Sequence, residues 1–170
     1  MDGVTVVPAT AVDQPKIANM LQLYIYDFTE MWAGEERGEL EEDGSFGAYE
    51  PLGSYWREDG REPLLIRVGG RLAGFALLNQ ETRTGRAADW DMAEFFIVRK
   101  HRRSGAGMAA AHAIFESHPG QWELAIARGN LGAQKFWPRT VASAPGVRAI
   151  ETLDKAHGAW NGPILRFRIG

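Results

Sequence analysis

Four cations and two glycines lie close together in the middle of the chain. Residues Arg99–Arg103 supply the four formal cations, and Gly105 and Gly107 follow directly. An apolar run, residues 90–98, precedes them, and a strong helix former, residues 109–115, comes after. Backbone N–H groups at a helix N-terminus have no partner inside the helix, and glycine lets an anion approach them closely. Because the whole chain has a net charge of -3, this local positive charge favours a specific polyanion such as a pyrophosphate.

The length and composition are those of a soluble globular protein. A chain of 170 residues is long enough to bury a core, and we expect residues 1–170 to form one domain. The apolar fraction of 45% and the charged fraction of 24% are ordinary for this class. The absence of cysteine excludes disulfides, thiolate metal ligands and a cysteine nucleophile, and it agrees with a reducing cytoplasm.

Several kinds of partner are not expected. No apolar run approaches the ~20 residues that a membrane span needs, and residues 1–4 do not resemble the start of a signal peptide. The mildly acidic balance argues against nucleic-acid binding, which requires a broad basic face. No metal site is expected, because ligand spacing is absent among His101, His112, His118 and His157. We therefore expect a cytoplasmic protein without a membrane, nucleic-acid or metal partner.

The N-terminal third predicts a strand, a helix and an irregular segment. Residues 4–7 form the first strand, and Asp13 can cap a helix that tolerates Pro15 in its first turn. One face of this helix carries Ile17, Met20, Leu21, Tyr24, Ile25 and Phe28 at helical spacing. The pattern is less regular in residues 31–60, where six of the nine residues 35–43 are acidic. A further short helix is indicated there by Tyr49, Leu52, Tyr55 and Trp56.

The middle of the chain predicts three strands, a helix and a fourth strand. Residues 63–68 and 71–79 are two strands joined by the two-residue turn Gly69-Gly70. The apolar run described above is the next strand. A helix of about residues 105–117 follows it, and residues 121–127 form the strand after that helix.

The C-terminal part completes the expected sheet. Asn130 opens a shorter helix that Pro138 should end or kink, and residues 147–153 and 163–169 are a closing pair of strands. This order of elements predicts a mixed α/β sheet. The strands before and after the 105–117 helix should be parallel neighbours, and ligands in such sheets bind beyond the carboxyl ends of the strands.

The glycine pattern is accompanied by a second motif. Residues Arg102–Gly107 fit Gln/Arg-x-x-Gly-x-Gly/Ala, and Asn130, Ala133 and Phe136-Trp137 follow the next strand. In these motifs and in the order of its elements the chain resembles the GNAT N-acetyltransferase superfamily, with the specific motifs confined to about residues 90–137. The resemblance implies an α/β (α+β mixed) fold whose mostly antiparallel sheet has one parallel pair splayed at a coenzyme A cleft and is flanked by helices. It also implies acetyl-CoA as cosubstrate.

The same resemblance implies which residues bind acetyl-CoA. Backbone amides of the glycine loop would hold the pyrophosphate, at Arg103, Ser104, Gly105, Ala106, Gly107 and Met108, and Arg102 beside them is also a cofactor-binding candidate. A bulge would open the strand edge for the pantetheine arm, which would lie along Phe95, Phe96 and Ile97. Asn130 would hydrogen-bond the arm from the other side. One backbone N–H near Phe96 or Ile97 would face the thioester oxygen and stabilise the oxyanion, a contribution of roughly 3 kcal/mol to the barrier.

Acetyl transfer to an amine also benefits from a base, because an ammonium with a pKa of about 10 is mostly charged at neutral pH. Glu94 is the first catalytic candidate, since it precedes the pantetheine segment and has apolar neighbours that would raise its pKa. Asp91 is the second, because a bulge alters which side chains face the cleft. Many members of the superfamily carry a tyrosine as general acid where this chain has Trp137, so the sequence assigns no acid.

Other interpretations of these residues stay open. Residues 105–110 also match the dinucleotide fingerprint of nicotinamide oxidoreductases, although Glu123 lies inside the next strand and too little chain follows for that fold. The basic run can be a solvated loop, Glu94 a salt-bridged carboxylate and Asp91 a structural group. Asn130 can cap its helix while it contacts the arm, because its amide has both donors and an acceptor.

The acceptor is expected on the side of the early helices. Aromatic side chains are dense there, mostly as core residues, at Tyr24, Tyr26, Phe28, Trp32, Tyr49, Tyr55 and Trp56. With the acids of residues 35–43, some of these rings could receive a cationic amine. The sequence thus predicts an N-acetyltransferase that acts on a primary amine of a small molecule, peptide or protein by direct transfer in a ternary complex. A non-catalytic acyl-CoA-binding sensor or interaction module is the alternative, and a homodimer stays open.

Overall fold

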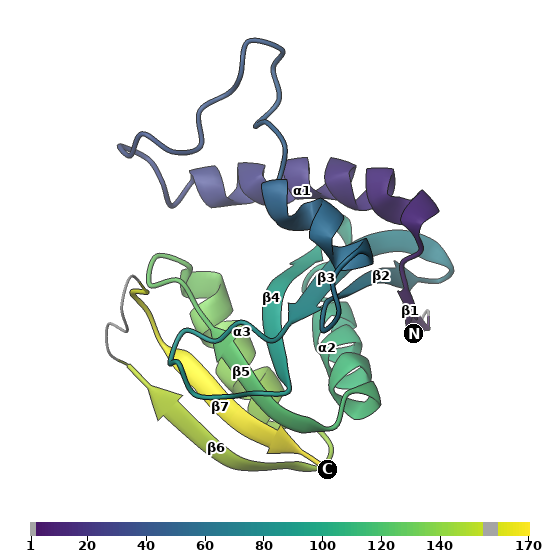
Figure 1. The fold of residues 1–170 in the computed structure, drawn as a ribbon, viewed down its shortest axis with the longest axis vertical. Coiled ribbons are helices and arrows are strands. Elements are labelled where there is room, and N and C mark those ends of the chain that lie inside the picture. The colour runs from purple at the N-terminus through teal and green to yellow at the C-terminus, as the bar shows by residue number, and fades with distance from the viewer. Residues whose placement is uncertain (1–2, 155–159) are drawn as a thin grey trace.

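The sheet predicted from the sequence runs through the described part of the chain. The computed structural model describes residues 3–154 and 160–170, in which seven strands form one sheet of order β1-β2-β3-β4-β5-β7-β6 (Figure 1). The strands are β1 (Val4–Pro8), β2 (Glu62–Val68), β3 (Arg71–Asn79), β4 (Trp90–Ile97), β5 (Gly120–Ala125), β6 (Val147–Leu153) and β7 (Ile164–Ile169).

One pair of neighbouring strands is parallel and the others are antiparallel. The parallel pair is β4 and β5, and the crossover between them contains α2 (Ala106–Ser117). Antiparallel strands β2 and β3 are joined at Gly69 and Gly70, which both have positive φ as a tight hairpin turn requires. The predictions of a mixed sheet, of this hairpin and of one parallel pair are therefore confirmed.

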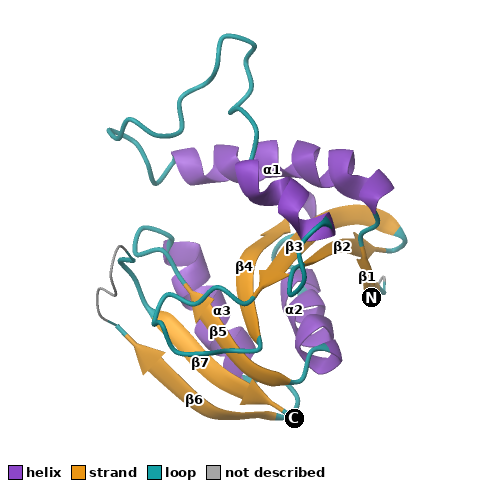
Figure 2. Cartoon of the chain, in the orientation of Figure 1, coloured by secondary structure: helices purple, strands orange, loops and turns teal. Residues whose placement is uncertain are grey.

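Helices cover both faces of the sheet and bury a separate core under each. Helix α1 (Gln14–Thr29) and the 3-10 helix η2 (Glu50–Trp56) lie over one face, called the α1 face here (Figure 2). Helices α2 and α3 (Leu131–Ala142) lie over the other, the α2 face. The α1-face core includes Ile17, Leu21, Leu52, Tyr55, Leu65, Phe75, Leu77 and Phe96. The α2-face core includes Leu78, Met92, Ile114, Phe115, Trp122, Trp137, Val141 and Phe167.

The start of α1 differs from its prediction. Asp13 does precede the helix, but its side chain makes no capping bond to it. Instead, the Asp13 carboxylate accepts hydrogen bonds from the Thr10 N–H (2.9 Å) and from Lys16 Nζ (2.6 Å). A capping residue is normally extended, whereas Asp13 ends the 3-10 turn η1 (Ala11–Asp13) with helical φ and ψ of -87° and -9°. The predicted side-chain cap is wrong because this turn directs the carboxylate toward the Thr10 N–H and away from the first amides of the helix.

Helix α3 does not end at Pro138. It continues for another turn to Ala142, although proline removes one N–H donor and leaves the Gln134 carbonyl without its usual helical partner. Trp137 and Val141 flank the proline and are buried in the α2-face core. Their packing against the sheet outweighs the lost hydrogen bond, so of the two predicted outcomes, an end or a kink, the end is wrong.

We predict that Gly74→Ala is strongly destabilising, because β3 and β4 approach very closely at this glycine. A Cβ at position 74 would lie 2.0 Å from the Phe96 carbonyl oxygen. Overpacking against backbone should lower the free energy of unfolding by roughly 3 kcal/mol, measured by urea denaturation. Gly3→Ala is the control, since a Cβ there meets no atom within 4 Å. Equal stability of the two variants would contradict the close approach.

Candidate active site

A bulge in β4 places two carboxyl groups on the same face of the sheet. Leu77 of β3 pairs with Glu94, whereas the next residue, Leu78, pairs with Met92, so Ala93 has no partner on β3. Paired residues share a face: Leu77 belongs to the α1-face core, and Glu94 therefore lies on that face.

Asp91 lies on the same face as Glu94. It pairs with Asn79, whose side-chain amide donates to the Tyr55 hydroxyl of η2 at 3.2 Å. Strict alternation along β4 would put positions 91 and 94 on opposite faces. The extra residue cancels this alternation, as bulges do next to functional sites. The bulge implied by the resemblance is thus present, and it brings both candidate carboxyls together.

The parallel strands separate just before the bulge. Among the described residues, β4 and β5 are paired only at Trp90 with Trp122 and at Asp91 with Glu123. The Val98 N–H donates to the Ala73 carbonyl at 2.8 Å, so the backbone of Val98 faces β3.

Where β4 and β5 have separated, a gap lies between them. Backbone groups point alternately to the two sides of a strand, and this decides which groups of β4 face the gap. The Phe96 carbonyl faces β3, where it almost touches Gly74. Phe95 and Ile97 therefore direct their N–H and C=O groups toward the side from which β5 has diverged, and Arg102 Nε donates to the Ile97 carbonyl at 2.7 Å. Of the two predicted oxyanion donors, the Ile97 N–H faces the gap and the Phe96 N–H does not.

Glu94 is half-buried beneath two tyrosines. The Tyr49 hydroxyl donates to Glu94 Oε1 at 2.9 Å. Removal from water raises the pKa of the Glu94 carboxyl, while the hydroxyls of Tyr24 and Tyr49 and the charge of Arg83 act in the opposite direction. The net shift is upward, which brings the carboxyl closer to the pKa that a base needs at neutral pH.

Asp91 has a different electrostatic environment. Only 7% of the residue is exposed, and within residues 3–154 and 160–170 no hydrogen bond to its carboxyl is found. Burial and the neighbouring Glu123 raise the pKa of Asp91 to about 8, although Arg83 opposes the shift. At neutral pH this carboxyl therefore carries a proton and is a hydrogen-bond donor.

Beside Asp91, a buried ion pair fastens the β3–β4 loop. Glu123 is fully buried and accepts from Arg166 (2.5 Å) and from Thr84 Oγ1 (2.6 Å). Arg166 also donates to the Ala87 carbonyl at 2.8 Å. Sequence reasoning missed this pair because Glu123 alternates with Trp122 and Leu124, a pattern typical of a solvent-facing side chain.

The glycine loop forms a cradle of free amides. After the 3-10 turn η3 (Arg99–His101), Arg103 has a φ of +59° and Gly105 a φ of +85° before α2 begins. Within the described residues, no partner is found for the N–H groups of 103–108, and the first amide bond of the helix runs from Ala109 to Gly105 (3.0 Å). Six neighbouring donors at a helix N-terminus are suited to an anion.

Two of the four cations are engaged by α1. Asp27 accepts from Arg99 Nη2 at 2.8 Å, and it also pairs with Arg102. Burial raises the pKa of the Asp27 carboxyl, but the two guanidinium groups more than offset this, so the net shift is downward. The Arg102 side chain thus fastens the glycine loop to α1 and to Ile97, and the free donors of the loop are backbone amides.

The remaining predicted residues lie on the β5 side of the gap. The Asn130 side chain accepts from the Ala133 N–H at 3.0 Å and caps α3, which leaves its NH₂ group for another acceptor. Trp137 is buried, with its ring 5.0 Å from that of Phe95 and steeply inclined to it. The indole fills the α2-face core, so this position brings no hydroxyl to the gap.

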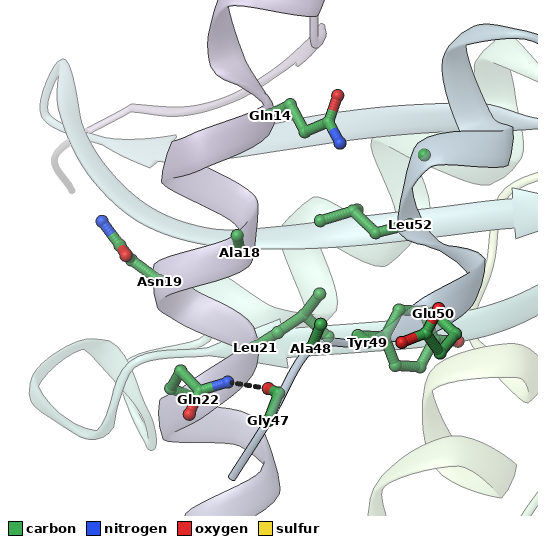
Figure 3. Close-up of a pocket in the computed structure, with 11 residues that line it drawn as sticks. Gln14, Ala18, Asn19, Leu21, Gln22, Gly47, Ala48, Tyr49, Glu50 and Leu52 are labelled. Atoms are coloured by element: carbon green, nitrogen blue, oxygen red, sulfur yellow. Dashed lines mark hydrogen bonds between the residues drawn. The ribbon is translucent and has the colours of Figure 1, made fainter. Parts of the chain in front are cut away.

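The aromatic side chains of the N-terminal third are largely structural. Tyr24 packs edge-on against Phe28 (4.7 Å) and Phe75 (5.9 Å), and Phe28 stacks on Trp32 (5.5 Å). A pocket of about 420 Å³ lies between α1 and residues 47–53, and Tyr49 is part of its wall (Figure 3). Residues 35–43, six of which are acidic, are exposed apart from Gly38, which is half-buried.

Searches for two other kinds of site gave no candidate in the described ranges. No helix there is long and apolar enough to cross a membrane. No group of three or more histidine, aspartate or glutamate residues in the same ranges could hold a metal ion.

Comparison with known proteins fits this geometry. A family model described as the acetyltransferase (GNAT) family matches residues 17–141. The chain belongs to this family. The match includes β4, the glycine loop and most of α3, which are the elements that build the gap.

Solved acetyltransferases have the same fold at low sequence identity. One from Thermus thermophilus has a TM-score of 0.62 and 16% identity, covering 97% of this chain and 96% of that chain. A GNAT-family acetyltransferase from Staphylococcus aureus has a TM-score of 0.59 and 10% identity, covering 99% and 100%. A PaiA N-acetyltransferase from Thermoplasma acidophilum, solved in complex with coenzyme A, has a TM-score of 0.53 and 10% identity, covering 99% of each. No curated protein matches the sequence.

We predict that Asp91→Asn makes stability less dependent on pH. Between the ordinary pKa of 3.8 and about 8, the folded protein holds a proton on Asp91 that the unfolded chain has released. The free energy of unfolding should therefore fall as pH rises through this window, by up to about 1.4 kcal/mol per pH unit. Urea denaturation at pH 5 and pH 8 measures this. Asp59→Asn, at an exposed position, is the control. If the free energy of unfolding falls with pH equally steeply in the wild type and in Asp91→Asn, the raised pKa of Asp91 is refuted.

Proposed function

We propose that this chain moves an acetyl group from acetyl-CoA to a primary amine, by direct attack of the amine in a ternary complex. The observation that carries the proposal is the row of six free amides at the start of α2, next to the strand edge that β5 has left exposed. Membership of the GNAT family and the similarity of the fold to a protein solved with coenzyme A support it.

The residues of the gap fit coenzyme A. The amides of 103–108 would bind the pyrophosphate, because helix N-termini bind phosphate groups through free N–H donors. The exposed backbone groups of Phe95 and Ile97 would pair with the amides of the pantetheine arm, as a neighbouring strand does. The free NH₂ of Asn130 would donate to the same arm from the β5 side.

Glu94 is proposed as the base. Its carboxyl lies on the α1 face next to the bulge, and burial raises its pKa toward the range useful at neutral pH. It would accept a proton from the acceptor ammonium, directly or through water, and so keep the attacking nitrogen neutral. Asp91, the second candidate, holds its own proton at neutral pH, so we assign it a donor role beside Glu94.

The remaining chemistry needs little from side chains. Acetyl-CoA supplies a thioester whose thiolate leaves readily. The Ile97 N–H, which faces the gap, would donate to the carbonyl oxygen as negative charge develops there. Because Trp137 is buried and apolar, we assign no acid at that position.

A non-catalytic module is the second candidate function. Trp137, at the position where the superfamily often has its acid, is the observation that favours it. Such a module would bind acetyl-CoA through the same amides, and Glu94 would have no catalytic role in it. Cleavage of the thioester, followed with a thiol-reactive dye over a panel of amines, distinguishes the two functions.

We predict that Gly105→Val weakens coenzyme A binding at least tenfold, or about 1.4 kcal/mol. A branched side chain at a φ of +85° both strains the loop and obstructs the approach of the phosphates. Calorimetry measures the affinity. Gly34→Val is the matched control, because Gly34 has a φ of +86° and equally open space but lies outside the loop. Equal affinity in the two variants would exclude this loop as the phosphate site.

We predict that Glu94→Gln lowers kcat/KM for amines at least about 100-fold. The loss should be greatest at the lowest pH at which Glu94 is still ionised, since deprotonating the acceptor is hardest there. The dye assay from pH 6 to 9 measures this, with Glu116→Gln on the exposed side of α2 as control. Tight acetyl-CoA binding without turnover, and with no effect of Glu94→Gln, would favour the non-catalytic module instead.

A further inference from the structure

The hydroxyl that meets Glu94 comes from an element distant in sequence. Tyr49 is the residue immediately before η2, at the end of the segment that follows α1, and its hydroxyl donates to Glu94 Oε1 at 2.9 Å. Burial and the nearby Glu94 carboxylate raise the pKa of the Tyr49 phenol well above its ordinary value. The phenol therefore keeps its proton at working pH and acts only as a donor to Glu94.

The position of Tyr49 is fixed from α1 by one amide side chain. Gln22 Nε2 donates to the Gly47 carbonyl at 2.8 Å (Figure 3). Gln22 Oε1 accepts from the Phe46 N–H, also at 2.8 Å. On the other side, the Leu52 N–H donates to the Tyr49 carbonyl at 3.0 Å. The backbone on both sides of the tyrosine is thus held, and the ring is directed at β4.

The charged and titratable groups around Glu94 make this hydrogen bond important. Tyr24 reaches it from α1, Tyr49 from the start of η2, and Arg83 acts on it from the β3–β4 loop. Asp91 lies on the same strand and face. Because burial favours the protonated carboxyl and a donor favours the carboxylate, loss of the Tyr49 hydroxyl should leave Glu94 protonated over a wider pH range.

We infer that Tyr49 is a positioning residue that keeps the Glu94 carboxylate ionised and aimed at the acceptor amine. The inference rests on the proposed function, in which Glu94 is the base. Tyr49 acts through Glu94 and does not itself exchange a proton with the acceptor. Gln22 supports it by holding the backbone at Phe46 and Gly47.

Tyr49→Phe tests the inference, with Tyr55→Phe as matched control. Tyr55 lies in the adjoining short helix, and its hydroxyl accepts from Asn79 and is not bonded to Glu94. In Tyr49→Phe the acidic limb of the kcat/KM profile should move up by about one pH unit, so that activity on that limb falls by up to roughly tenfold and recovers at higher pH. Tyr55→Phe should keep the wild-type profile. A uniform loss at every pH would mean a structural role and overturn the inference.

A readout without turnover separates this inference from the proposed function. The Glu94 carboxyl can be titrated by ¹³C NMR in the free protein, its signal assigned by loss in Glu94→Gln. Its midpoint should rise in Tyr49→Phe, and by a smaller amount in Gln22→Met, which keeps the hydroxyl but loses both loop bonds. A raised midpoint without acetyl transfer to any amine would refute the proposed function and leave the coupling intact. Transfer that depends on Glu94, with unchanged midpoints in both variants, would refute the role of Tyr49.

Discussion

The site depends on one extra residue in β4. Ala93 has no partner on β3, and this bulge turns Glu94 to the face that already carries Asp91. The pairing of β4 with β5 ends at Asp91, so on this side the backbone groups of Phe95 and Ile97 have no partner on a neighbouring strand. A regular strand would pair those groups and direct the two carboxyls to opposite faces. The carboxyl chemistry and the opening therefore have a common structural cause.

The binding and catalytic parts are joined by contacts across the α1 face. Asp27 near the end of α1 holds Arg99 and Arg102 of the glycine loop, and Gln22 on the same helix holds the segment that carries Tyr49. Helix α1 thus contacts both the anion cradle and the surroundings of Glu94. The two arginines fasten the loop, and the amides that we propose as phosphate donors are backbone groups whose positions these arginines help to fix. This division explains how a chain with a net charge of -3 can still offer a local anion site.

Three carboxyls on the neighbouring strands β4 and β5 have three different electrostatic environments. Glu123 is paired with Arg166 and serves the loop before β4. Asp91 has no such partner, and burial next to Glu123 raises its pKa to about 8. Glu94 accepts a hydrogen bond from the Tyr49 hydroxyl, and its pKa is raised by burial. Residue type alone does not separate these roles, because each depends on which donors approach from other elements.

The sequence alone determined the strand–loop–helix around the two glycines, the hairpin and the parallel pair, because these follow from local periodicity and from glycines whose backbone freedom is a local property. Glu94 and Asp91 became candidates through the resemblance of the sequence to the GNAT superfamily. The sequence could not show that Glu123 is buried, that α3 continues past Pro138 or that Arg102 binds Asp27, since those depend on contacts between residues far apart in the chain. Tyr49 was one of several aromatics in the sequence, and only the tertiary structure distinguished it. Its hydroxyl meets Glu94 because α1, η2 and β4 pack together, and a contact across 45 positions leaves no local pattern.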